Sequence, residues 1–313
     1  MVNDDHLRSV FRGSLLGGAI GDVLGAPFEG WPIVTGDALA RAMAQIDRLQ
    51  YTDDTHMTIG MAESLVACGG FDGDHMARMF AEHFKAEPWR GYGSGPPAVF
   101  RMLEIGIPWD QAASQLFGGD GSYGNGAAMR VAPAALLSYS DPERLRDIVS
   151  RTAIITHSHE LGVEGAVIQA RAIASLVAHT LGEPLNVSEF LDDLRSATLI
   201  MAYEQQIDRV EHLLHEREPG RVAREIGTGI TALEAVPAAL FAFLFARDSF
   251  SDVIATAIAL GGDTDTIAAM AGNLAGAYLG EEAIPEEWRT GVEGAALLRQ
   301  LADRLLDLAG AAS

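Results

Sequence analysis

The chain has 313 residues, of which 48% are hydrophobic and 21% charged, a composition typical of a globular protein with a sizeable core rather than of a disordered chain. Its 22 basic and 43 acidic side chains give a formal net charge of −21, which argues against nucleic acid or anionic membranes as partners through general electrostatics. A phosphate-bearing ligand stays compatible with this charge where bound cations and backbone N–H groups supply a local positive potential.

Cysteine content and hydropathy indicate in which compartment the protein acts. The single cysteine, Cys68, excludes an internal disulfide and a multi-thiolate zinc site, and its apolar and glycine neighbours predict a packed, inert thiol. Segment 1–11 lacks a secretory pattern, and the longest apolar run, 236–246, is too short to cross a membrane and contains Pro237. We therefore expect a cytoplasmic monomer with no membrane contact, and the absence of a linker predicts one domain over residues 1–313.

Helix-compatible apolar periodicity recurs along the chain, whereas alternating strand patterns are nearly absent, so the sequence predicts a mostly α-helical protein. The predicted helices are, in chain order, 38–49, 55–67, 74–85, 127–137 with an interruption at Pro133, 142–153, 164–179, 187–215, 231–246, 250–259, 266–279 and 288–309. Glycine-rich connectors lie between them at 25–32, 90–97, 118–126 and 260–266.

Two segments place glycine at every fourth residue. These glycines are Gly13, Gly17, Gly21 and Gly25 near the start, and Gly272, Gly276 and Gly280 near the end. On a helix they would form a ridge without side chains, at a cost of about 1 kcal/mol each relative to alanine. Two interpretations stay open: the ridges pack against each other and bring both ends of the chain to the centre of the fold, or the segments are partly loop.

Two acidic clusters each precede a helical pattern: Thr52-Asp53-Asp54, and Asp263-Thr264-Asp265-Thr266. Taken singly, each is explained by helix capping and by the helix dipole. Taken together, they offer closely spaced carboxylates that repel each other unless a cation or protons intervene. Hard divalent cations prefer such oxygen ligands, and the lack of cysteine or histidine in the clusters argues against zinc or copper. The pair therefore indicates a magnesium or manganese site with room for two ions.

Two glycine-rich connectors have the composition of a phosphate site. Segments 91–95, Gly-Tyr-Gly-Ser-Gly, and 122–126, Ser-Tyr-Gly-Asn-Gly, present backbone N–H groups that can hold an oxyanion, each with a tyrosine able to stack on a base. No strand pattern precedes them and no Gly-Lys-Ser/Thr follows, so neither is a Walker loop or a dinucleotide fingerprint. Flexible connection is the alternative.

Three further polar residues stand out. Glu29 lies between glycines and a proline, where it could move toward a ligand or simply be a surface carboxylate. His157 and His159 alternate at the start of a helix, so their side chains would point in different directions. We expect capping or hydrogen bonding from them rather than metal ligation.

These pieces, in this order, resemble the ADP-ribosylglycohydrolase family, which includes the activating glycohydrolase of dinitrogenase reductase and the vertebrate ADP-ribosylhydrolases. The matching segments are 11–30, 51–65, 90–95, 121–136, 156–166 and 260–280. The forms SYGNGAAMRVAP and GGDTDT resemble particularly the branch that cleaves serine-linked ADP-ribose and O-acetyl-ADP-ribose. Residues 200–230 are not matched and do not inform the choice of acceptor.

The resemblance implies a single, orthogonally packed all-α domain that hydrolyses the bond between ADP-ribose and an acceptor. The implied ligands of two Mg²⁺, with Mn²⁺ as the alternative ion, are Thr52, Asp53, Asp54, Asp263, Asp265 and Thr266. The implied catalytic residues are Glu29 and Asp265, with the acid and base roles not divided between them. The implied ADP-ribose contacts are Gly91, Gly93, Ser94, Gly95, Ser122, Tyr123 at the adenine, Gly124, Asn125 and His157 near the ribose and phosphates.

The resemblance also implies the partners, which are ADP-ribosylated proteins or small ADP-ribose esters. An O-linked acceptor such as serine or the acetyl group is preferred. An enzyme for ADP-ribosyl-arginine and a catalytically silent ADP-ribose or nucleotide sensor are the alternatives. The complete acidic clusters argue against the sensor, since a pure binder does not need groups that activate water.

Overall fold

The computed structural model describes residues 4–44, 50–180 and 183–311, and within these ranges the chain is helical and forms no strand. An isolated bridge between Gly124 and Thr231 is the only β-type pairing there. The α-helices are α1 Asp4–Gly25, α2 Gly36–Met43, α3 Asp53–Cys68, α4 Gly73–Ala86, α5 Gly95–Glu104, α6 Trp109–Ala112, α7 Gly126–Met129, α8 Ala132–Leu137, α9 Pro142–Ala153, α10 Glu160–Val177, α11 Val187–Ala197, α12 Met201–Leu213, α13 Pro219–Ile226, α14 Ala232–Ala246, α15 Phe250–Ala259, α16 Thr264–Leu279, α17 Glu286–Gly291 and α18 Ala295–Ala311. Short 3₁₀ segments are η1 Ala26–Phe28, η3 Ala113–Gly119 and η4 Glu281–Ala283.

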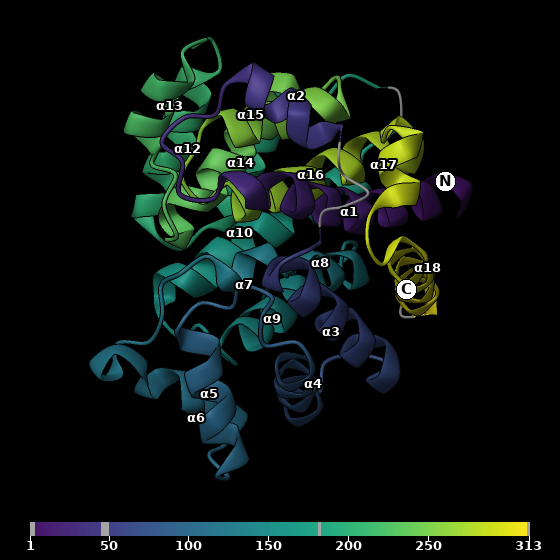
Figure 1. Ribbon diagram of the computed structural model, residues 1–313. Helices are drawn as coiled ribbons and strands as arrows, with labels where there is room; N and C mark the ends of the chain where they lie inside the picture. Colours follow the sequence, from purple (N-terminus) through teal and green to yellow (C-terminus); the bar gives the residue numbers. More distant parts are fainter. Residues whose placement is uncertain (1–3, 45–49, 181–182, 312–313) are drawn as a thin grey trace.

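Helices α1 and α16 lie across the centre of the molecule, with other helices on both sides (Figure 1). In the view of Figure 1, α2, α12, α13, α14 and α15 lie above them, and α3 to α10 lie below. Helices α4 and α18 are seen almost end-on while α1 and α16 run across the view, so helices of different layers pack at steep angles. This arrangement confirms the expected orthogonally packed all-α fold. That residues 1–313 form one domain stays a prediction.

The glycine ridges pack directly against each other. A Cβ atom on Gly13 would lie 2.5 Å from the carbonyl oxygen of Gly276, and one on Gly17 would lie 2.3 Å from that of Gly272. The same register continues to the end of α1, where a Cβ on Gly25 would lie 2.4 Å from the Thr264 carbonyl oxygen. The two helices are therefore antiparallel in backbone contact along their length, which confirms the helical interpretation over the loop.

Two of the predicted long helices are each divided into two. The predicted helix 187–215 is divided at 198–200, where the Leu199 amide donates to the Glu164 carboxylate at 2.7 Å and the Ile200 amide donates to Thr198 Oγ1. The predicted helix 288–309 is divided at 292–294, where Val292 is extended and Gly294 has a positive φ of 75°, a conformation that glycine adopts readily. A distant carboxylate thus captures backbone N–H at the first break, and a glycine interrupts the helix at the second.

Smaller differences from the predicted elements have local causes. Helix α5 starts in Gly-Pro-Pro, a sequence that resembles a loop, yet proline suits the first turn of a helix because it has no N–H to lose there. Helices α7 and α8 replace the predicted 127–137, and the break lies just before Pro133, as expected. Of the predicted helix 38–49, residues 45–49 lie outside the described part of the chain.

The expectation for Cys68 is wrong, because its thiol is exposed. Cys68 belongs to the last turn of α3, which extends past the packed part of the helix and ends at Gly69 in the left-handed conformation. Its apolar neighbours therefore do not bury it, and only Leu65 and Val66, one turn earlier, reach the core.

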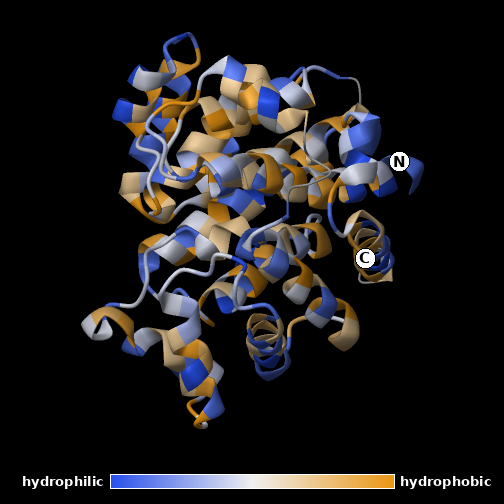
Figure 2. Cartoon of the chain, in the orientation of Figure 1, coloured by the Kyte–Doolittle hydropathy of each residue, from blue (hydrophilic) through white to orange (hydrophobic). Residues whose placement is uncertain are grey.

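Apolar surface is concentrated inside the fold (Figure 2). Helix α14 buries every side chain from Ala235 to Leu244, including Pro237. The outward faces of helices such as α4 and α13 are hydrophilic in the same view. Among the described helices, none combines the length and apolarity needed to cross a membrane.

Substitution at the glycine ridge should strongly destabilise the protein. In Gly276→Ala, the new Cβ would lie 1.9 Å from the Gly13 carbonyl oxygen, and backbone cannot move aside as a flexible side chain can. We expect a loss of about 3 kcal/mol or more in the free energy of unfolding. The control is Gly310→Ala at an exposed position near the end of α18, where nothing lies within 4 Å of the new Cβ; it should be neutral or stabilising by up to about 1 kcal/mol. Equal denaturant midpoints for both variants would contradict the packing argument.

Candidate active site

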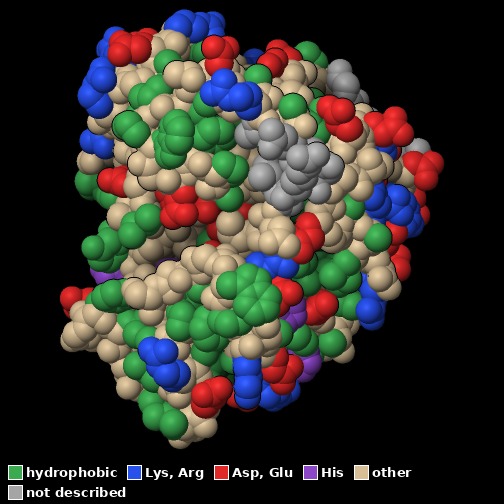
Figure 3. All heavy atoms as spheres, viewed as in Figure 1, with side chains coloured by type: hydrophobic (Ala, Val, Ile, Leu, Met, Phe, Trp, Pro, Cys, Tyr) green, Lys and Arg blue, Asp and Glu red, His purple; other side chains and the backbone are tan. Residues whose placement is uncertain are grey.

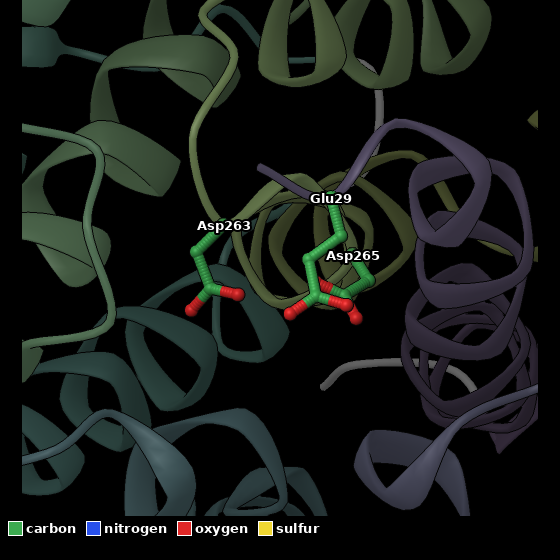
Figure 4. A group of neighbouring side chains, drawn as sticks. All are labelled: Glu29, Asp263 and Asp265. Carbon is green, nitrogen blue, oxygen red and sulfur yellow. The ribbon is translucent and has the colours of Figure 1, made fainter. Parts of the chain in front are cut away.

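Glu29, Asp263 and Asp265 meet beside the junction of the two central helices (Figure 4). Each offers a carboxylate oxygen, and these oxygens lie within 4.8 Å of one another. The glycine register explains the meeting, because the end of α1 lies against the start of α16 and the Thr264 hydroxyl donates to the Gly25 carbonyl at 2.9 Å. Glu29 follows directly after η1, so it lies over the acidic start of α16.

The loop of Glu29 is held to the loop that precedes α16. The Gly30 amide donates to the Gly262 carbonyl at 2.8 Å, and the Gly262 amide donates to the Trp31 carbonyl at 2.7 Å. Glu29 itself remains exposed, whereas Asp263 and Asp265 are buried. The three carboxylates therefore lie together, but only that of Glu29 is open to solvent.

The start of α3 supplies the second acidic cluster. Thr52 caps the helix, with its Oγ1 accepting from the Asp54 amide at 3.3 Å. The Thr266 hydroxyl donates to Asp54 Oδ2 at 3.4 Å, so the clusters from the two halves of the chain are in contact. The other Asp54 oxygen, Oδ1, is buried and has no hydrogen-bond partner. The capping explanation thus holds for Thr52, but it leaves a buried carboxylate oxygen unsatisfied.

Asp22 connects α1 to this cluster and was missed in the sequence. It is fully buried, and its carboxylate accepts from the Thr52 amide at 3.0 Å, the Thr55 amide at 3.1 Å and the Thr55 hydroxyl at 2.6 Å. A lone aspartate in the apolar run Gly-Ala-Ile-Gly-Asp-Val-Leu-Gly was the available signal, because an unpaired carboxylate is costly in a buried helix.

The carboxylates are buried close together, so that they favour binding protons or a cation. Burial, with nearby Asp22, raises the pKa of Asp53 to about 7, and burial with Asp263 raises the pKa of Asp265 to about 9. Burial raises the pKa of Asp54 well above its ordinary value, and burial and Asp263 raise that of Glu29. A divalent cation would relieve this repulsion, and the unsatisfied Asp54 Oδ1 offers it a free ligand oxygen. The oxygen-only donor set therefore fits a hard cation.

The first glycine-rich loop, 91–95, lies next to the α3 cluster. A Cβ on Gly91 would lie 3.7 Å from Asp53 Oδ1. Arg90 holds the two segments together: it donates to the Tyr51 carbonyl at 2.9 Å and makes two hydrogen bonds of 2.8 Å to Glu293. Gly91, Gly93, Ser94 and Gly95 all line the pocket that contains the carboxylates.

Tyr92 does not have the freedom that its loop suggested. Its hydroxyl pairs with His56 Nδ1 at 2.9 Å, and its ring packs edge-on against Phe84 with centroids 5.0 Å apart. The expectation that this tyrosine is able to stack on a base is therefore wrong. The ring instead anchors the loop to α3 and α4.

The second glycine-rich loop, 122–126, closes the other side of the pocket. The Asn125 amide donates to the Ile230 carbonyl at 3.0 Å, and the Ala232 amide donates to the Tyr123 carbonyl at 3.0 Å. The Asp263 amide donates to the Thr228 carbonyl at 2.8 Å, so segment 228–232 joins this loop to the start of α16. The previously unmatched region near residue 230 thus has a structural role at the site.

The predicted ligand-binding side chains of this loop have different surroundings. Ser122, Gly124 and Asn125 line the pocket, but the Asn125 side-chain amide is hydrogen-bonded to the Asp263 carboxylate. Tyr123 is half exposed and packs edge-on against His159 with centroids 5.5 Å apart. Neither Tyr123 nor Thr52 is among the residues that line the pocket itself.

The two histidines make hydrogen bonds, as expected. His159 caps α10 by accepting from the Leu161 amide at 3.1 Å. His157 is buried, lines the pocket, and pairs through Nδ1 with the Thr156 hydroxyl at 2.8 Å.

Apolar residues that sequence reasoning missed complete the pocket: Phe117, Met129 and Ile230. Phe117 is 59% exposed and has a positive φ of 51°, a conformation that few non-glycine residues adopt. On the face shown in Figure 3, acidic side chains lie at the edge of a hollow on the left of the molecule, between its upper and lower parts. The site thus combines acidic, glycine-rich and apolar walls, as expected for a phosphate-bearing ligand held beside a divalent cation.

Comparisons with known proteins assign this chain to a family. A family model described as ADP-ribosylglycohydrolase matches residues 3–313. The ADP-ribosylhydrolase ARH3 of Mus musculus is 36% identical over 91% of this chain and 88% of its own length. The ADP-ribosyl-[dinitrogen reductase] glycohydrolase of Rhodospirillum rubrum is 28% identical over 95% of this chain and 96% of its own. A solved structure titled "ADP-ribosylglycohydrolase-related protein complex" superposes with a TM-score of 0.77 at 27% identity, covering 97% of this chain and 99% of that one.

These relatives place the chain among the hydrolases. The chain belongs to the ADP-ribosylglycohydrolase family. Hydrolysis of ADP-ribosyl groups is the general activity that this membership supports.

A divalent cation should stabilise the protein most at alkaline pH. The raised carboxylate pKa values mean that the folded chain binds more protons than the unfolded one between pH about 4 and 9, so stability falls as pH rises. We expect Mg²⁺ to raise the melting temperature of EDTA-treated protein by several degrees at pH 8 and by less at pH 5.5. Exposed Asp110 supplies the control, since Asp110→Asn should keep the full response and Asp265→Asn should lose most of it. A Mg²⁺ response independent of pH and of Asp265 would contradict this account.

Proposed function

We propose that this protein is a magnesium-dependent hydrolase that cleaves the bond between C1″ of ADP-ribose and an O-linked acceptor, releasing ADP-ribose. The observation that carries the proposal is the meeting of Glu29, Asp263 and Asp265 with the Asp54 cluster in one pocket lined by two glycine-rich loops. Its substrates would be ADP-ribosylated proteins or small ADP-ribose esters, and residues 1–313 would act as one domain.

We assign the cation ligands to the two acidic clusters. Thr52, Asp53 and Asp54 from α3 and Asp263, Asp265 and Thr266 from α16 would hold two Mg²⁺ ions, with Mn²⁺ as the alternative. When bound, such ions orient ribose hydroxyls and lower the pKa of a coordinated water. Asp22 and Asn125 support this arrangement, because Asp22 fixes the start of α3 and Asn125 fixes the Asp263 carboxylate.

Glu29 and Asp265 are the candidates for proton transfer at the sugar. Glu29 is exposed at the pocket, and burial together with Asp263 raises the pKa of its carboxyl above the ordinary value, which suits a group that exchanges protons with a ligand. Asp265 is buried, and burial and Asp263 raise its pKa to about 9. Either carboxylate can accept the proton of the attacking water, or donate one to the departing acceptor oxygen.

The glycine-rich loops would hold the rest of the ligand. The 91–95 loop and residues Ser122 to Asn125 would surround the pyrophosphate, where absent side chains let the backbone N–H groups approach. Tyr123, half exposed at the pocket rim, is proposed to face the adenine. With the ligand placed in this way, its distal ribose would lie near Glu29, and the acceptor would lie outside the pocket.

The acceptor is assigned from motif forms and from relatives. The segments SYGNGAAMRVAP and GGDTDT resemble the forms of the branch that acts on O-linked ADP-ribose. The chain is 36% identical to the mouse ADP-ribosylhydrolase and 28% identical to the Rhodospirillum rubrum enzyme named for dinitrogen reductase, which favours an acceptor other than that protein. The runner-up is hydrolysis of the N-glycosidic bond to arginine.

Matched serine-linked and arginine-linked ADP-ribosyl peptides test the proposal. We expect ADP-ribose release from the serine peptide only, with Mg²⁺ and not with EDTA. Glu29→Gln should slow this release by about 100-fold or more and keep the melting response to Mg²⁺, because the cation ligands are unchanged. Release from the arginine peptide alone would replace the proposal with the runner-up. ADP-ribose binding without release from either peptide would indicate a sensor.

A further inference from the structure

Arg130 is a buried cation directly behind the pocket. Its side chain is completely inaccessible and lies over the Phe80 ring, 4.9 Å from the centroid. It donates to the Gly126 carbonyl at 2.8 Å and to the Thr156 hydroxyl at 2.7 Å, while its Nε has no partner. Within the described residues, no carboxylate forms an ion pair with it. Burial lowers the pKa of Arg130 to about 9, so the guanidinium stays charged at neutral pH.

A buried charge without a counter-ion is costly, so a site that keeps one commonly uses it. Arg130 lies at the break between α7 and α8, immediately behind the glycine-rich loop that ends in Gly126. In a chain of net charge −21, this placement puts positive potential behind the wall that should face an anionic ligand.

The Thr156 hydroxyl links Arg130 to His157 through two hydrogen bonds. Arginine has donors and no acceptor, so the hydroxyl oxygen accepts from Arg130 and keeps its one hydrogen for another group. The imidazole Nδ1 of His157, 2.8 Å away, is the only other hydrogen-bonding partner of this hydroxyl in the described structure. A proton on Nδ1 would leave the buried hydroxyl hydrogen without an acceptor. Nδ1 therefore accepts, and the ring proton of His157 resides on Nε2.

The Nε2 edge of His157 points at the second glycine-rich loop. A Cβ on Gly126 would lie 2.9 Å from Nε2, and one on Gly124 would lie 3.4 Å from it. Among the described residues, no protein group makes a hydrogen bond with Nε2, although His157 lines the pocket. The absence of side chains at both glycines leaves this edge open toward a ligand.

We propose that Arg130 and Thr156 are positioning residues that hold His157 as the neutral Nε2–H tautomer, so that its imidazole donates to an anionic oxygen of the ligand pyrophosphate. This inference rests on the proposed function for the identity of the ligand, and on the hydrogen bonds alone for the tautomer. Burial and the charge of Arg130 lower the pKa of His157 to about 3, which keeps the ring neutral over the working pH range. The cation polarises the chain of hydrogen bonds, so that a neutral donor meets the phosphate.

Imidazole nitrogen NMR of the ¹⁵N-histidine-labelled full-length protein tests the tautomer. We expect the His157 signal, assigned with His157→Gln, to show the Nε2–H form without change from pH 5.5 to 8. In Thr156→Val the donor to Nδ1 is lost, so the signal should move toward a mixture of tautomers. Thr156→Ser restores a hydroxyl and should restore the wild-type signal.

Ligand binding and turnover test the consequence. Thr156→Val should weaken ADP-ribose binding and raise KM by about tenfold, the scale of one hydrogen bond to a charged group, while kcat changes less than threefold. Thr156→Ser should recover both values. Ser64→Ala is the matched control, because it removes another bond of 2.8 Å between a hydroxyl and an imidazole Nδ1, that of His75, from residues that do not line the pocket. It should leave His157 and ADP-ribose binding unchanged.

The outcomes separate this inference from the proposed function. An Nδ1–H form of His157 in the wild type, or wild-type binding by Thr156→Val, would overturn the positioning role even if hydrolysis is normal. The tautomer of His157 measured in the wild type tests the positioning role even if Thr156→Val does not fold. A wild type that shows the Nε2–H form but neither binds nor hydrolyses ADP-ribosyl compounds would overturn the proposed function, and with it the assigned ligand.

Discussion

Backbone contact between α1 and α16 is the constraint on which the site depends. Glycines at every fourth position remove the side chains that would separate the helices, and the antiparallel register brings Gly25 against Thr264. Every residue placed near this junction follows from that register: Asp22 faces the start of α3, Glu29 lies just past the end of α1, and Asp265 lies in the first turn of α16. Residues more than two hundred positions apart in sequence thus become one site.

The carboxylates that this packing brings together are unfavourable without a partner. Burial raises the pKa of Asp53, Asp54 and Asp265, and one Asp54 oxygen has no hydrogen-bond partner. Such an arrangement lowers the stability of the cation-free fold and raises its affinity for a cation, since a bound cation relieves the repulsion between the carboxylates. It also resolves the difficulty of holding a phosphate in a chain of net charge −21, because positive potential is needed only locally.

Features that pair or repeat in the sequence were predictable from the residues alone, whereas Glu29 needed the family resemblance and other single residues were missed. The two acidic clusters were found because neighbouring carboxylates demand an explanation, and the ridges because glycine repeats every fourth residue. Asp22 and Arg130 were missed because each is one charged residue in an apolar stretch, with partners that only the fold supplies. The helix break at Thr198 was missed for the same reason, since the capturing group Glu164 lies far away in sequence. The Tyr92 ring was misjudged because its packing against α4 leaves no local signal.

The central claim is that clusters from opposite ends of the chain form one centre for divalent cations. Anomalous diffraction from crystals grown with Mn²⁺ and ADP-ribose tests it most directly. The account predicts two manganese peaks between the starts of α3 and α16, in contact with Asp54 and Asp265, with Glu29 and the ligand ribose beside them. Manganese bound elsewhere, or ADP-ribose bound in this pocket with no metal peak, would contradict it.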